Sequence, residues 1–130
     1  MDIGQRALDY HKNGYNCAQS VFAACCEYTG MDEKTALALS AGFGGGARSG
    51  ELCGAVTGAI MAEGLVFPFN DGQDTEAKDK IASIAKQCVN IAREKYGYVR
   101  CADLKGNINC SEIIAFMAKT AEDIMKKEKN

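Results

Sequence analysis

The chain has 130 residues, enough for one domain with a single core, and we predict that residues 1–130 form one helical, cysteine-rich domain. Its net charge of −2, with dispersed basic residues, argues against nucleic acid as a partner, and no apolar run reaches the roughly 20 residues needed for membrane insertion. The N-terminus is polar and lacks a signal core, so we expect a cytoplasmic protein.

Apolar side chains at helical spacing predict a series of helices along the chain. In order, they cover residues 3–13, 17–29, 32–41, 51–63 and 74–96, and a last one follows residue 109. Gly14, Gly30 and Gly97 stand where three of them end. No alternating strand pattern of useful length appears, so the fold class is all-α, a compact bundle of roughly six helices.

Two segments interrupt the helical pattern. Residues 42–50 contain five glycines, so we expect no regular helix or strand there, and the backbone can pass close to other groups. Residues 98–109 are irregular, with at most one helical turn at residues 102–104. In the helix after the glycine-rich loop, Gly54 and Gly58 share one face, and such a small-residue face allows another backbone to approach closely.

The seven cysteines are an odd number, so they cannot all pair within one chain. In a reducing compartment, cysteines are more often catalytic or metal-binding than structural. Cys25 and Cys88 lie on the apolar stripes of their helices, where a free cysteine acts as a small hydrophobic residue. Cys26 points about 100° away from Cys25 around the helix, so the two are not expected to form a disulfide.

The other four cysteines are the candidate site residues. Cys17, Cys53 and Cys110 lie at predicted helix starts, and Cys101 lies in the irregular segment. A helix start favours the thiolate, which is the form that attacks disulfides and binds metals. No CxxC motif occurs, and most of the spacings are long. Only the fold could therefore assemble a shared four-cysteine site, and spacing alone leaves its existence open.

Two further side chains could contribute to such a site. His11 is the only histidine, and we expect it on a partly buried helix face rather than as a ligand. Arg48 could stabilise a thiolate near Cys53, or it could be a solvated loop charge. We expect the glycine-rich loop to wrap its backbone closely around the sulfur atoms.

Several motifs resemble a family of redox-active proteins named C_GCAxxG_C_C. The segment from Asn16 to Val21 resembles its opening motif, although Asn16 replaces a glycine and Val21 a small residue. Residues 41–46 and 50–59 continue the likeness, and the run CGAVTG from Cys53 is the most specific element. The likeness resumes at Cys101 and Cys110. It implies redox activity carried by Cys17, Cys53, Cys101 and Cys110.

Two mechanisms fit these four residues. They could act as redox thiols in thiol/disulfide exchange or electron transfer, in the manner of a thiol/disulfide oxidoreductase. Alternatively, the same four could be metal ligands for an iron–sulfur cluster or another thiophilic metal. A third reading is a non-catalytic helical binding module. The sequence names no redox partner, and it leaves open whether the protein is an enzyme and whether it forms a homo-oligomer.

Overall fold

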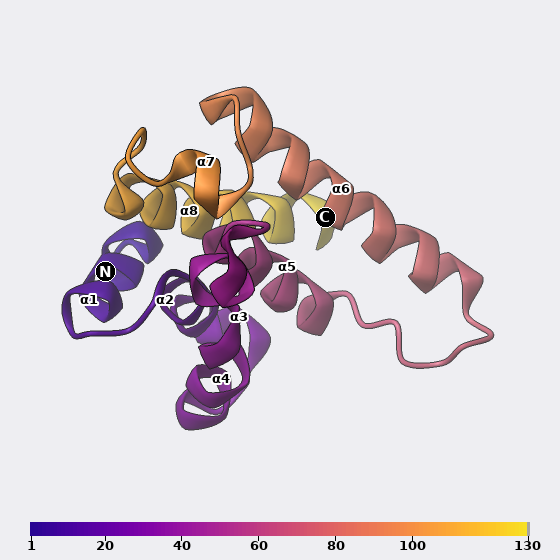
Figure 1. Ribbon diagram of the computed structural model, residues 1–130. Helices are drawn as coiled ribbons and strands as arrows, with labels where there is room; N and C mark the ends of the chain where they lie inside the picture. Colours follow the sequence, from indigo (N-terminus) through magenta and orange to yellow (C-terminus); the bar gives the residue numbers. More distant parts are fainter. Residues whose placement is uncertain (130) are drawn as a thin grey trace.

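The computed structural model describes residues 1–129, and within this range the chain forms helices and no strand, which confirms the all-α class (Figure 1). Six of its eight α-helices have seven or more residues. The α-helices are α1 (Ile3–Lys12), α2 (Cys17–Ala24), α3 (Cys26–Thr29), α4 (Glu33–Ser40), α5 (Gly54–Val66), α6 (Thr75–Tyr96), α7 (Cys101–Leu104) and α8 (Cys110–Lys129). The glycine-rich segment holds a short 3-10 turn, η1 (Ala41–Phe43), and a π-type turn, η2 (Gly46–Gly50).

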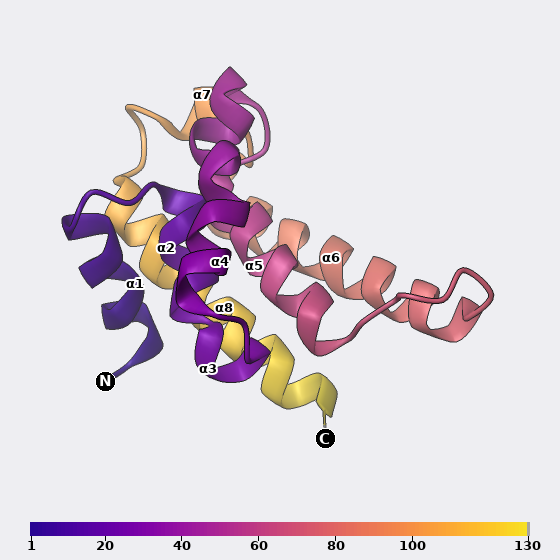
Figure 2. The same cartoon turned by 90° about the horizontal axis from the view of Figure 1, so that it is seen from below.

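Helix α5 lies at the centre of the molecule. It packs on α2, α6 and α8, and α1 packs in turn on α2 and α8. The beginning of α6 extends away from α1 and α2, together with the loop that follows α5 (Figure 2). The core between these helices is made of fully buried apolar side chains, among them Val21, Phe22, Val56, Ile84, Ile114 and Met117.

Two predicted helix boundaries were wrong. The helix predicted over residues 17–29 breaks at Cys25, whose N–H bonds to the carbonyl of Phe22 at 3.1 Å, three residues back, and so tightens the turn. The helix predicted from residue 51 begins only at Gly54. Residues 51–53 are instead extended, because they pair with residues 99–101 in an antiparallel bridge.

The predicted close approach at the small-residue face of α5 is confirmed. A Cβ atom on Gly58 would lie 2.7 Å from the carbonyl oxygen of Ala18 in α2, a distance that real Cβ atoms essentially never show. A Cβ atom on Gly54 would lie 2.5 Å from the Cys17 sulfur and 2.8 Å from the carbonyl oxygen of Phe43. Glycine at both positions therefore allows α5 to contact α2 through backbone.

None of the helices in residues 1–129 is both long enough and apolar enough to cross a membrane.

Candidate functional site

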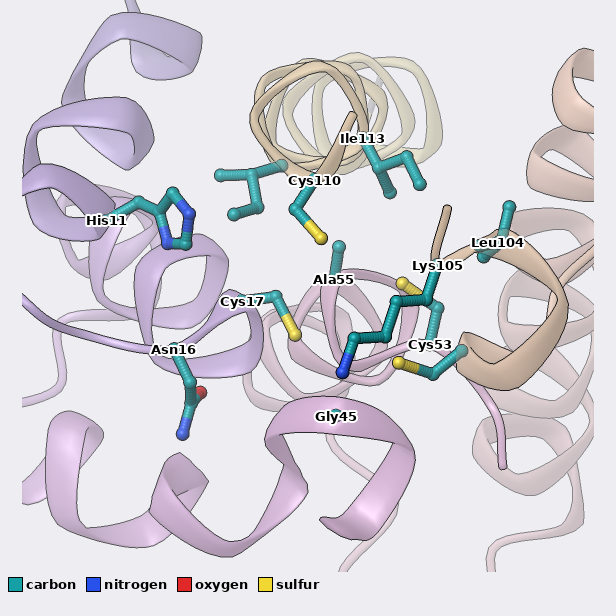
Figure 3. A pocket seen from close by; sticks show the side chains of 12 residues that line it. His11, Asn16, Cys17, Gly45, Cys53, Ala55, Leu104, Lys105, Cys110 and Ile113 are labelled. Carbon is teal, nitrogen blue, oxygen red and sulfur yellow. The ribbon is translucent and has the colours of Figure 1, made fainter. Parts of the chain in front are cut away.

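One cavity of about 210 Å³ brings the four candidate cysteines together (Figure 3). Cys17, Cys53, Cys101 and Cys110 all line it, and its wall is otherwise mostly apolar. Cys53 is buried, Cys17 and Cys101 are half-buried, and Cys110 is exposed. The remaining three cysteines are not part of this wall. The fold thus assembles a shared cavity from residues that are up to 93 positions apart.

Cys17 is held by a firmly capped helix. The side chain of Asn16 accepts the backbone N–H of Gln19 at 2.9 Å, and the Gln19 side chain accepts the N–H of Asn16 at 3.0 Å. This reciprocal capping fixes the first turn of α2, where Cys17 is the first residue. Asn16 also donates to the carbonyl of Ala41 at 2.9 Å, which ties the glycine-rich loop to the same helix start.

Cys53 and Cys101 are joined through the antiparallel bridge between Leu52 and Arg100. The Cys53 N–H donates to the carbonyl of Val99 at 2.8 Å, and the Cys101 N–H donates to the carbonyl of Glu51 at 2.7 Å. This pattern makes the two cysteines diagonal neighbours on one face of the bridge. The bridge therefore brings two sulfur atoms from distant parts of the chain into the same cavity.

Every one of the four cysteines lies at or next to a helix start. Cys101 begins the one-turn helix α7, which confirms the single turn predicted at residues 102–104 and starts one residue earlier. Cys53 directly precedes α5, and Cys110 begins the 20-residue helix α8. The side chain of Asn109 accepts the N–H of Ser111 at 2.8 Å and so helps to fix this last helix start.

Burial dominates the acidity of Cys53. It raises the pKa of the Cys53 thiol to about 11. The backbone N–H groups of Ala55 and Val56 at the start of α5 work in the opposite direction, as the helix-start argument predicts. The nearby Cys17 and Cys101 thiols raise it further. Cys53 is therefore the innermost of the four, and its burial favours the neutral thiol.

Cys101 has a cationic neighbour. Burial raises the pKa of its thiol, and the Cys17 and Cys110 thiols add to that rise, while Lys105 lowers it. The Lys105 side chain reaches into the cavity in Figure 3. Lys105 was not among the predicted site residues. Its position four residues after Cys101 was the available signal, because residues four apart share one side of a helical turn.

His11 also lines the cavity, from the last turn of α1, and its Nδ1 atom lies 3.1 Å from the carbonyl oxygen of Tyr15. The His11 side chain is half-buried, as predicted, and it faces the cavity. Arg48 is exposed, as expected of the solvated loop charge that was one of its two predicted roles. It lines a second cavity together with Cys101, and Cys53 is not part of that wall.

No disulfide is formed by any of the seven cysteines. As the side chains stand in residues 1–129, no three His, Cys, Asp or Glu groups are placed to hold one metal ion. The chemistry of the donor set nevertheless fits an iron–sulfur cluster, because such clusters take four cysteine thiolates in an apolar setting with N–H donors nearby. Cys17, Cys53, Cys101 and Cys110 would hold it.

The prediction that Cys25 and Cys88 are buried is confirmed, since both are 0% exposed. They lie beside the carboxyl of Glu63, which is also 0% exposed, deeper along α5 than the four-cysteine cavity. Burial raises the pKa of both thiols well above the ordinary range. These two residues therefore have the properties of packed, unreactive thiols.

Comparison with known proteins assigns the chain to a family. A family model described as "Putative redox-active protein (C_GCAxxG_C_C)" matches residues 15–124. No match was found among curated proteins or among solved structures. The name places one cysteine before the motif and two after it. Of the four cavity residues, only Cys53 has one cavity cysteine before it and two after it. With a match over most of its length, the chain belongs to the C_GCAxxG_C_C family of redox-active proteins.

Proposed function

We propose that the protein exchanges electrons through thiol/disulfide chemistry at Cys17, Cys53, Cys101 and Cys110. The observation that carries the proposal is the single cavity that all four unpaired cysteines line. Their graded exposure supports it. A partner can reach the exposed Cys110 and the half-buried Cys101, while Cys53 lies behind them in the wall. Disulfide exchange needs one thiol that a partner can reach and a second thiol nearby.

The exchange takes place in two displacements. A thiolate of the cavity attacks one sulfur of a partner disulfide, so that a mixed disulfide forms and the first partner thiolate leaves and takes up a proton from solvent. A neighbouring cavity thiolate then attacks the cysteine sulfur of the mixed disulfide. An internal disulfide forms, and the second partner thiolate leaves. The two cysteines lose two electrons, and the partner disulfide gains them.

The pairing follows from the neighbours of Cys101. Cys17, Cys53 and Cys110 all lie close enough to Cys101 for an influence on pKa, so the backbone geometry decides between them. Cys53 is its diagonal neighbour across the bridge, and diagonal Cα atoms lie roughly 7–8 Å apart, beyond the usual disulfide range of about 4.4–6.8 Å. We therefore expect Cys101 to pair with Cys17 or Cys110 rather than with Cys53.

The experiment is oxidation of the reduced protein with a small neutral disulfide, followed by digestion and mass mapping of the bonds formed. The expected result is one internal disulfide that includes Cys101. C101S should lose it, and C26S is the matched control, because Cys26 is half-buried but lies outside the cavity. Seven free thiols after oxidation, or bonds that exclude all four cavity residues, would overturn the proposal.

A second candidate function is an iron–sulfur or other thiolate-bound metal centre held by the same four residues. The observation that favours it is four thiols around one largely apolar cavity, with the N–H groups of Ala55 and Val56 directed at the innermost sulfur. A bound cluster would supply one-electron transfer. Anaerobic purification with iron and sulfide analysis tests it. A colourless, metal-free protein prepared in this way would rule it out, and C26S should again leave the metal content unchanged.

A further inference from the structure

A second cavity lies beside the first and gives separate access to Cys101. Its volume is about 280 Å³, and it is lined by Gly45, Arg48, Gly50, Cys101, Ala102 and Lys105. Gly45, Cys101 and Lys105 line both cavities, so the two adjoin at these residues. Cys101 is the one cysteine that lines both cavities.

This outer cavity is basic. Arg48 and Lys105 are both exposed, and within residues 1–129 neither forms an ion pair. No carboxylate lines either cavity. The nearest acidic residue along the loop, Glu51, is engaged by Arg100 at 3.5 Å.

The backbone holds Arg48 at this place. Ala47 and Arg48 have φ values of 58° and 61°, a left-handed conformation that side-chain-bearing residues rarely adopt. Such strain occurs where a structure fixes a functional group. The guanidinium folds back over the loop, so that a Cβ on Gly45 would lie 3.9 Å from its Nη1 atom. Arg48 is thereby directed toward the residues that separate the two cavities.

We propose that this outer cavity binds the anionic end of the substrate, with Arg48 and Lys105 as the binding cations. The substrate class is a small disulfide that carries carboxylates, and its sulfur would be presented to Cys101. This inference rests on the proposed exchange function and adds the charge of the substrate to it. The bond changes are those of the two displacements described above, with the thiolate of Cys101 as the first attacking group.

The experiment uses three small disulfides of similar length and different charge: 3,3′-dithiodipropionate (anionic), bis(2-hydroxyethyl) disulfide (neutral) and cystamine (cationic). The oxidation rate of the reduced protein is measured with each and divided by the rate of free 2-mercaptoethanol in the same buffer. We expect the normalised rate to be highest for the anionic compound. The ratio of the anionic to the neutral rate removes any change in the reactivity of the thiol itself.

R48Q and K105Q should each lower this ratio by about threefold to tenfold, the effect of one unit charge a few ångströms away at a hydrated surface. K78Q removes the same charge from an exposed site near the start of α6 and should leave the ratio unchanged. In the wild-type protein, raising the ionic strength should lower the ratio as well, which tests the idea without any variant.

The outcomes separate the two proposals. If the neutral disulfide oxidises the protein but the ratio matches that of the free thiol and does not respond to R48Q, K105Q or salt, the anion site is wrong and the exchange function stands. If none of the three disulfides oxidises the protein, the exchange function itself fails, and the anion site fails with it.

Discussion

Glu63 should make the stability of this protein depend strongly on pH. Its side chain is fully buried on α5, and neither carboxyl oxygen has a hydrogen-bond partner within residues 1–129. Burial raises the pKa of this carboxyl from 4.5 to about 8, although the adjacent Cys88 thiol works in the opposite direction. Glu63 is therefore mostly protonated in the folded protein at neutral pH, and ionised in the unfolded chain.

The sign and size of the effect follow from these two pKa values. The folded state binds the proton of Glu63 more tightly than the unfolded chain does. The contribution of Glu63 to the free energy of unfolding is therefore greatest below pH 4.5, and it is lost as the pH rises toward 8. Each pH unit within this window costs up to about 1.36 kcal/mol of unfolding free energy. Between pH 5 and pH 7 the loss assigned to Glu63 is about 2.5 kcal/mol.

The variant E63Q keeps the shape of the side chain and cannot ionise. We expect the free energy of unfolding of the wild-type protein, relative to E63Q, to fall by about 2.5 kcal/mol from pH 5 to pH 7. Urea denaturation at pH 5, 6 and 7 with a phosphine reductant measures it. E94Q, at an exposed position in α6, is the matched control, and its free energy of unfolding should change with pH in the same way as that of the wild type. Parallel curves for the wild type and E63Q would refute the reasoning.

Three further predictions concern the site and its frame. G58A should lower the free energy of unfolding by about 1–3 kcal/mol in urea denaturation, because the added Cβ meets the backbone of Ala18. G64A in the same helix is the control: its Cβ meets nothing within 4 Å, so it should be neutral or stabilising in the same assay. Iodoacetamide should alkylate the exposed Cys110 within minutes and leave the buried Cys25 unmodified in the folded protein; equal rates by mass spectrometry would contradict the assigned burial. N16A should cost about 1–2 kcal/mol of unfolding free energy and increase the alkylation of Cys17, since it removes the helix cap; an unchanged midpoint would mean that the cap contributes little.

Much of the fold could be predicted from local patterns, because most of the long helices have an apolar stripe and a capping residue of their own, although the central helix α5 has no side-chain cap. Asp32 and Asn16 cap helices where expected, and Gly30 ends one with a φ of 73°. The breaks were less predictable. Cys25 interrupts a continuous apolar pattern, and nothing in its neighbours signals the tighter turn that separates α2 from α3.

The site was only partly predictable for a different reason. Position at helix starts separated Cys17, Cys53 and Cys110 from the buried cysteines, but the segment around Cys101 is ordered by pairing with residues 51–53, almost 50 positions earlier. Such non-local pairing leaves no periodic trace in a four-residue helix. Lys105 belongs to the cavity because of that same pairing. Its spacing from Cys101 indicated a place near that residue, but it could not show that the other three cysteines line the same cavity.

The backbone contact between α2 and α5 has a consequence for how electrons could move. Cys17 begins α2 and Cys53 directly precedes α5, and the two helices meet where the Ala18 carbonyl fills the space that a side chain on residue 58 would need. Two helices in such contact cannot slide or tilt without collision. We expect the backbone around Cys17 and Cys53 to stay nearly fixed when the site is oxidised or reduced. Because few atoms must then move for each electron transferred, the reorganisation energy is small, and a small reorganisation energy makes electron transfer faster.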